Sequence, residues 1–357
     1  MPTPQWNIQT WTANLASWTA QGEAGHYGDH WGDPEADPAL GQVRDDWVTP
    51  VVGQGRTVLE IGSGGGRWTQ YLLGAARLWC VDINPEMFDY LRQRFGERPN
   101  LSYVRTTGTD IAGVPAGSVD LAFSFGTFVH LDPELVDGYL ATLRGLMRPG
   151  ADLVLQYPEK RKPLARQNQG FALNTAPLME GLVRRHGFEV QRRDLGLLPH
   201  SNLLHATLDP QAPTAHPLAT AAPYRFLGWP DYADAEGLAA FFGAFGLVLA
   251  GRPHCALCLR YDPSVDGPAE SLGPVLQAAF ARALPDGADL EVLLVDDPIG
   301  VHQRDAVGRA VTAVLLPERA FGVREHFLAG VGAPAVTATE LDEWLWPRGA
   351  AAVGKTT

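Results

Sequence analysis

The feature that most constrains this chain is a strand-like run that ends in three spaced glycines. Residues 57–61, Thr-Val-Leu-Glu-Ile, are mostly apolar or β-branched, and glycine follows at positions 62, 64 and 66. Glycine there lets the backbone turn tightly and lets a ligand approach it closely. A helix-like segment follows over 67–76. The order strand, glycine loop, helix predicts a ligand site at the carboxyl end of a parallel strand.

Strand-like and helix-like segments keep alternating beyond the loop. Strands are predicted at 78–83, 101–106, 119–124, 152–157, 188–194 and 202–208, and helices at 85–95, 133–147 and 175–186. Strands that alternate with helices of this length predict an α/β fold with a parallel sheet covered on both faces.

Two acidic residues indicate the kind of ligand. Asp82 ends the second strand, 22 positions after Glu60, and a carboxylate there can accept hydrogen bonds from both hydroxyls of a ribose. A dinucleotide site would carry the spacing G-x-G-x-x-G, whereas this loop reads E-x-G-x-G-x-G. Glu60 would repel a pyrophosphate but suits an ammonium group. The pair therefore predicts a cofactor that contains a nucleoside and an amino group.

On these residues, about 40–208 resembles the class I S-adenosylmethionine (SAM)-dependent methyltransferases. The resemblance implies a Rossmann-like, seven-stranded α/β sheet and S-adenosyl-L-methionine as cofactor. It extends to Asp110, where the family often places an acidic side chain at the adenine amino group, although Asp110 reads equally as a turn cap. The implied cofactor-binding residues are Glu60, Gly62, Ser63, Gly64, Gly66, Asp82, Ile83, Gly108, Thr109, Asp110 and Ser124.

Two histidines are candidates for the catalytic base, because an imidazole near neutral pKa can accept a proton from a hydroxyl. His130 falls just beyond the fourth predicted strand, near the expected methyl group. His200 lies in the loop between the last two strands of the same sheet. A packing or capping role remains the alternative for each.

Candidate substrate contacts lie in three segments. Tyr27 and Trp31 belong to an aromatic, glycine-containing stretch within a predicted N-terminal arm or lid, 1–40. Arg161 lies in a basic run that suits an anionic substrate, and Ser201 and Asn202 follow His200. An arm packed on the surface, a solvated loop and a capped turn are the respective alternatives.

The remainder of the chain is predicted to form a second unit. A Pro- and Ala-rich linker is expected over 209–234, then a smaller α/β domain over 235–350 and a tail over 351–357. Residues 309–317, with Gly322 and Gly332, make this domain similar to the nucleotide-sugar half of two-lobed (GT-B) glycosyltransferases. The two glutamates of those retaining enzymes are missing, because their positions read Arg319 and Phe327.

Composition limits the classes of partner. The net charge of -12 lacks the basic footprint of a nucleic-acid binder. No stretch is apolar enough to span a membrane, the start does not read as a signal peptide, and three cysteines make no disulfide framework. Cys255 and Cys258 are expected to be buried in a strand. We expect a cytoplasmic protein without a metal site, and the sequence predicts no oligomeric state.

Residues 127–134, 155–162 and 199–202 resemble segments of bacterial methyltransferases that modify glycans and sugars. The resemblance implies a methyltransferase that acts on a hydroxyl of a sugar, a glycan or a related small molecule. Two alternatives stay open. One is a binding or scaffold protein whose fold has lost activity. The other is a nucleotide-sugar-dependent transferase that uses the C-terminal domain.

Overall fold

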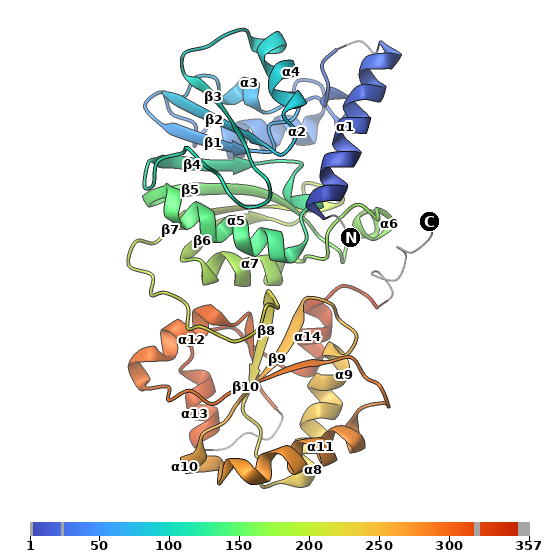
Figure 1. The fold of residues 1–357 in the computed structure, drawn as a ribbon, viewed down its shortest axis with the longest axis vertical. Helices are drawn as coiled ribbons and strands as arrows, with labels where there is room; N and C mark the ends of the chain where they lie inside the picture. The colour runs from blue at the N-terminus through green and yellow to red at the C-terminus, as the bar shows by residue number, and fades with distance from the viewer. Residues whose placement is uncertain (1–2, 23–24, 318–321, 349–357) are drawn as a thin grey trace. The chain divides into compact units, whose positions relative to one another are not determined.

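The strand that leads into the glycine loop, β1 (Thr57–Ile61), lies inside a seven-stranded sheet in the computed structural model (Figure 1). The structure describes residues 3–22, 25–317 and 322–348. The strand order is β3-β2-β1-β4-β5-β7-β6, and only β7 runs antiparallel to its neighbours in the described chain. The other bounds are β2 (Arg77–Asp82), β3 (Leu101–Arg105), β4 (Val119–Ser124), β5 (Met147–Pro158), β6 (Phe188–Asp194) and β7 (Ser201–Leu208).

This sheet brings the carboxyl ends of β1, β2, β4 and β5 to one edge, because these strands are parallel. β1 is buried from Val58 to Ile61, which explains its apolar residues, and Glu60 is the charged exception among them. The helices named before β6 in the chain are α1 (Pro4–Gln21), α2 (Pro38–Val43), α3 (Thr69–Leu72), α4 (Glu86–Phe95), α5 (Pro133–Leu146), α6 (Pro163–Gln167) and α7 (Ala176–Arg185). The predicted seven-stranded α/β sheet is confirmed.

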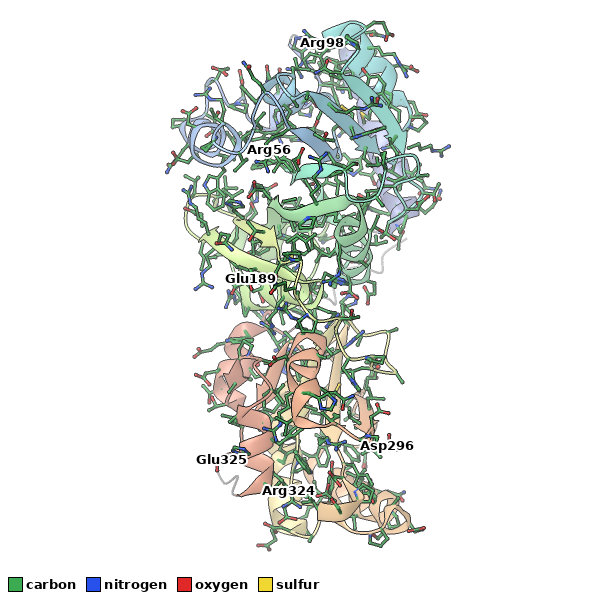
Figure 2. All side chains as sticks on the ribbon, turned by 90° about the vertical axis from the view of Figure 1, so that its left-hand side faces the viewer. Arg56, Arg98, Glu189, Asp296, Arg324 and Glu325 are labelled. Carbon is green, nitrogen blue, oxygen red and sulfur yellow. The ribbon has the colours of Figure 1, made fainter. Side chains whose placement is uncertain are left out.

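At the amino-terminal edge of the sheet, Arg56 precedes β1 and pairs with Asp152 of β5 at 2.6 Å (Figure 2). The same guanidinium donates to the carbonyl of Asp120 in β4. These bonds tie three strands together at the edge opposite to the glycine loop.

A second sheet of five parallel strands has the order β10-β9-β8-β11-β12. The strands are β8 (Tyr224–Gly228), β9 (Cys255–Arg260), β10 (Glu291–Val295), β11 (Ala313–Leu315) and β12 (Ala335–Val336). Its helices are α8 (Ala235–Phe241), α9 (Leu247–Leu249), α10 (Pro263–Asp266), α11 (Leu272–Ala283), α12 (Arg304–Ala310), α13 (Val323–Ala329) and α14 (Ala338–Trp344). Cys255 and Cys258 are buried in β9, as predicted. The predicted second α/β domain is confirmed.

The described residues divide into two units, one within 1–176, 187–211 and 347–357 and the other within 177–186 and 212–346. This division differs from the predicted one in two places. The segment 209–234, expected to be a linker, contains the five-residue strand β8. Its Pro- and Ala-rich composition gave no indication of a strand. Most of α7 belongs to the second unit, where Arg184 donates to the carbonyls of Val311 and Thr312 at 3.0 and 2.9 Å.

The glycosyltransferase-like segment can be followed only in part, because Arg319 lies outside the described residues. Phe327 is buried in α13, with its ring 5.2 Å from that of Trp229. In the described part of the chain, none of the helices has the length and apolar character needed to cross a bilayer.

Candidate active site

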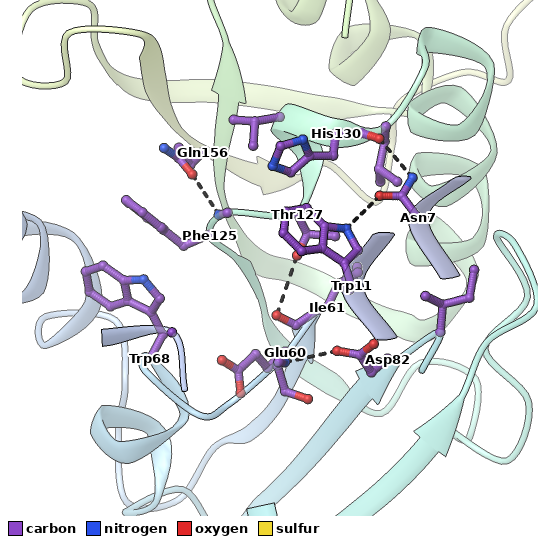
Figure 3. Close-up of a pocket in the computed structure, with 18 of the residues that line it drawn as sticks. Asn7, Trp11, Glu60, Ile61, Trp68, Asp82, Phe125, Thr127, His130 and Gln156 are labelled. Carbon is purple, nitrogen blue, oxygen red and sulfur yellow. Dashed lines mark hydrogen bonds between the residues drawn. The ribbon is translucent and has the colours of Figure 1, made fainter. Parts of the chain in front are cut away.

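A cavity of about 470 Å³ opens at the carboxyl edge of the first sheet (Figure 3). Its walls come from α1, the glycine loop, the end of β2, the segment after β4, and β5. Of the predicted site residues, those that line it are Tyr27, Trp31, Glu60, Gly62, Ser63, Gly64, Asp82, Ile83, Gly108, His130 and His200. Parallel strands thus bring together side chains that lie far apart in the sequence.

The glycine loop leaves no room for side chains at two positions. Gly62 has a φ of 74°, and a Cβ there would collide with the side chain of Thr127. At Gly65, a Cβ would collide with the backbone carbonyl of Tyr27. Ser63, beside them, is buried, and within the described ranges no group forms a hydrogen bond with its hydroxyl. The loop therefore offers a close backbone approach and one free hydroxyl to a ligand.

Asp82 is held by the backbone at the end of β2. Its Oδ2 accepts a hydrogen bond from the amide of Gly64 at 2.9 Å, and its Oδ1 accepts one from the amide of Asn84 at 3.0 Å. Burial raises the pKa of Asp82, and these amide bonds oppose that rise. The carboxylate is thus oriented by the glycine loop itself.

Glu60 is buried within β1. Its Oε2 accepts a hydrogen bond of 2.6 Å from the hydroxyl of Thr69. Burial raises the pKa of Glu60 to about 8, with a smaller contribution from Asp82. A cation bound nearby would favour the ionised form.

Four of the predicted cofactor residues lie outside the cavity lining. Asp110 accepts hydrogen bonds from the amide and hydroxyl of Thr107, both at 2.9 Å, so it caps its own turn. Those bonds lower its pKa. Ser124 donates to the carbonyl of Ile61 at 2.8 Å. Thr109 packs close to Gly138 of α5, and Gly66 packs against α4. For Asp110, the turn-cap alternative describes its contacts.

His130 lies on the cavity wall in a cluster of aromatic rings. Its Nδ1 is 2.7 Å from the carbonyl oxygen of Gly170. Because a carbonyl only accepts, this nitrogen carries the proton and Nε2 is left as the acceptor. The ring centroid lies 4.8 Å from that of Trp11 and 5.2 Å from that of Phe171. Burial lowers the pKa of His130 to about 4, so the ring is neutral at pH 7.

His200 lies on the other side of Phe171, with the two ring centroids 5.2 Å apart. Burial and then the charge of Lys162 lower its pKa. Its Nδ1 is buried and finds no hydrogen-bond partner in the described part of the chain. The two predicted histidines therefore line one cavity as neutral rings, separated by Phe171.

Three predicted substrate residues support the wall instead of lining it. Ser201 accepts a hydrogen bond of 2.7 Å from Gln156, whose side-chain oxygen accepts one of 2.7 Å from the amide of Gly126. Asn202 and Arg161 donate to the buried carboxylate of Glu159 at 3.0 and 2.8 Å. Each of the three therefore has at least one polar group bonded to the protein itself, while Oδ1 of Asn202 is buried without a partner among the described residues.

The N-terminal segment contributes residues that the sequence did not indicate. In α1, Asn7 donates to the carbonyl of His130 at 3.1 Å and accepts from the indole of Trp11 at 2.9 Å. Trp11 also lies 5.6 Å from Trp31, ring to ring. Tyr27 is buried and donates to Asn14 of α1 at 3.0 Å. The sequence does carry a signal for this helix, because Ile8, Trp11, Leu15 and Trp18 recur at helical spacing after its Thr3-Pro4 start.

The sheet order, the glycine loop and Asp82 at the end of β2 agree with one family comparison. Residues 58–150 match the sequence model described as "Methyltransferase domain". This part of the chain is a class I SAM-dependent methyltransferase domain. The enzyme's cofactor is SAM, and the site fits it: Ser63 has a free buried hydroxyl, Asp82 faces the cavity, and the loop lets a ligand approach its backbone.

Solved methyltransferase structures are similar to this chain at low identity. An S-adenosylmethionine-dependent methyltransferase from Mesorhizobium loti is 17% identical, with a TM-score of 0.41, over 49% of this chain and 99% of its own. The 1,6-didemethyltoxoflavin-N1-methyltransferase of Burkholderia thailandensis is 21% identical, with a TM-score of 0.41, over 58% and 92%. No curated protein matches the chain. Similarity at this level does not identify the methyl acceptor.

Proposed function

We propose that the enzyme transfers the methyl group of SAM to a hydroxyl of a sugar, a glycan or a related small molecule, with His130 as the base. The observation that carries this proposal is the 2.7 Å hydrogen bond between Nδ1 of His130 and the carbonyl of Gly170. It leaves an unprotonated Nε2 on a ring that lines the cavity.

The cofactor supplies a methyl group on a sulfonium, which is already electrophilic, so the protein's tasks are to orient the acceptor and to take its proton. The acceptor oxygen would bond to the methyl carbon as the bond between that carbon and sulfur breaks, with S-adenosylhomocysteine as the leaving group. Nε2 of His130 would take the hydroxyl proton and then release it to water, which restores the neutral ring. Trp11 and Phe171 pack against the ring in edge-to-face contacts, with centroids 4.8 and 5.2 Å away, and so help to fix its orientation.

The acceptor class is supported by the character of the walls. Trp11, Trp31 and Phe171 line the cavity and give flat apolar faces, on which a sugar or an aromatic ring can stack. Asn168 and His200 supply polar groups beside them. This combination suits a ring that carries hydroxyls.

The test is SAH formation from SAM with a panel of acceptors: monosaccharides, nucleotide sugars, glycosides and phenols. His130→Asn keeps a donor that can reach the Gly170 carbonyl but removes the base. We expect it to lose most turnover while SAM affinity is retained; His200→Asn is the matched comparison. Equal turnover in wild type and His130→Asn would contradict the proposal, and turnover only with amines would contradict the hydroxyl.

For the second unit we propose that it binds a sugar-containing ligand and does not catalyse a second transfer reaction. Phe327 lies where the GT-B resemblance would require a glutamate, and its buried ring packs on Trp229. Titration of the full chain with nucleotide sugars, and a search for sugar transfer, tests this. Sugar transfer that survives His130→Asn would contradict it.

A further inference from the structure

Arg67, the residue after the last glycine of the loop, lines the cavity without a counter-ion. Its Nη1 donates to the carbonyls of Trp31 and Gly32 at 3.0 and 3.1 Å. Within residues 3–22, 25–317 and 322–348, no carboxylate forms an ion pair with it. The guanidinium is thus a cation bonded only to neutral carbonyls.

Burial acts on this charge as expected for an uncompensated cation, since it lowers the pKa of Arg67 to about 10. The negative charge of Asp29 opposes that shift. However, the Asp29 carboxylate also lies 3.7 Å from the guanidinium of Arg94, so it is shared between two cations. A partly buried charge without a partner is costly unless a ligand supplies one.

The residue after Arg67 has a hydrogen-bond donor that faces no acceptor in the described chain. The indole nitrogen of Trp68 is buried and has no hydrogen-bond partner among the residues that the structure describes. Trp68 also lines the cavity, and its ring lies 4.5 Å from that of Phe125. The guanidinium of Arg67 lies 5.6 Å from the same ring. Both donors therefore flank Phe125, directly after β4.

We propose that Arg67 and Trp68 bind a carboxylate that a ligand brings into the cavity. A guanidinium can give two parallel hydrogen bonds to a carboxylate, and an indole N–H adds a neutral donor. Two ligands can supply this group: the α-carboxylate of the cofactor, or an acidic group on the acceptor. The proposal is independent of which atom is methylated and of the role of His130.

The first arm of the test uses calorimetric titration of the full chain with SAM and with decarboxylated SAM, which keeps the ammonium group. Wild type should bind decarboxylated SAM about 10- to 150-fold more weakly, the range for a lost charge-assisted hydrogen bond. In Arg67→Met that difference should fall to the small part that the neutral Trp68 donor supplies. The control is Arg77→Met, since Arg77 stacks 4.3 Å above Trp79 at the start of β2, at the opposite edge of the sheet.

The second arm applies if wild type binds the two cofactors alike. The SAH complex is then titrated with benzoate and with benzyl alcohol. Benzoate that binds wild type at least tenfold more tightly than Arg67→Met, with benzyl alcohol unchanged, assigns the acidic group to the acceptor. Trp68→Phe should weaken the same ligand less, because it removes a neutral donor only.

Two results would overturn the proposal: no carboxylate-dependent difference in either arm, or an equal loss of SAM and decarboxylated SAM in Arg67→Met. Arg67→Lys and thermal unfolding separate loss of charge from loss of fold, because Lys keeps the cation and should retain part of the discrimination. An error in the proposed hydroxyl chemistry would appear in turnover and not in these binding experiments.

Discussion

The hydroxyl of Thr69 donates a hydrogen bond of 2.6 Å to Oε2 of Glu60, and both residues are buried. Burial raises the pKa of the Glu60 carboxyl from 4.5 to about 8, and the hydrogen bond from Thr69 opposes that rise. In the folded protein Glu60 therefore holds its proton to a higher pH than in the unfolded chain. Its contribution to stability is fully present below pH 4.5 and is lost as the pH rises through about 8.

The first prediction is that Glu60→Gln stabilises the cofactor-free protein at pH 9, by more than about 1 kcal/mol, and changes little at pH 5. Thermal or urea unfolding at both pH values measures it. SAM binding should weaken in the same variant, because an ammonium group favours the ionised carboxylate. A stability gain of equal size at pH 5 would contradict the assignment to ionisation.

The second prediction concerns Asp82, the acceptor at the end of β2. Asp82→Ala should weaken SAM binding about 10- to 150-fold, equivalent to roughly 1.5–3 kcal/mol. Calorimetric titration measures the change. Asp89→Asn is the control, since Asp89 is an exposed residue of α4 that pairs with Arg92. Asp82 has no role in the cofactor site if both variants bind SAM like wild type.

The third prediction is a pH profile. With the pKa of His130 lowered to about 4, the imidazole is already neutral at pH 6. Turnover should therefore stay flat between pH 6 and 8, without the rising limb near 6.5 of an unperturbed histidine. A kcat that rises through pH 6.5 and loses this limb in His130→Asn would show that the pKa is not lowered.

The fourth prediction compares two glycines. Gly65→Ala should abolish SAM binding and lower the melting temperature, because the new Cβ collides with the Tyr27 carbonyl. Gly74→Ala places its Cβ in open space and should leave both unchanged. Calorimetry and thermal unfolding of the pair test this. Equal SAM affinity and equal melting temperature in the two variants would mean that the Tyr27 carbonyl does not lie against Gly65.

The fifth prediction is that Trp11→Ala raises the KM for the acceptor. Loss of a stacked ring costs about 1 kcal/mol, or roughly fivefold in KM. SAM affinity should change less, and Trp79→Ala on the far side of β2 should change neither. Steady-state kinetics with an active acceptor measure the effect. A selective rise in the KM for SAM would instead place Trp11 at the cofactor.

The sequence predicted those strands and helices whose formation depends mainly on residues close together along the chain. Strand boundaries from 57–61 to 201–208 agree within a few residues, except that β5 begins earlier, at Met147. The helix after the glycine loop is shorter at both ends than predicted, Thr69–Leu72, because turns occupy residues 67–68 before it and turns and bends occupy 73–76 after it.

What the sequence could not predict depends on contacts between distant segments. Asn7 reaches the carbonyl of His130 across 123 positions, and no local pattern marks either residue as a partner. Gln156 looks like an ordinary strand residue until β4 and β7 place Gly126 and Ser201 beside it. The donors of Arg67 and Trp68 become noticeable only once the surroundings show that they lack partners.

The membership of α7 has a practical consequence for dissecting the protein. This helix comes between β5 and β6 in the chain, yet its Arg184 bonds to Val311 and Thr312. A fragment that stops at residue 211 would keep every strand of the first sheet and deprive α7 of those acceptors. The two units alternate along the chain, so a continuous fragment of either one omits a segment of its own unit or includes a segment of the other.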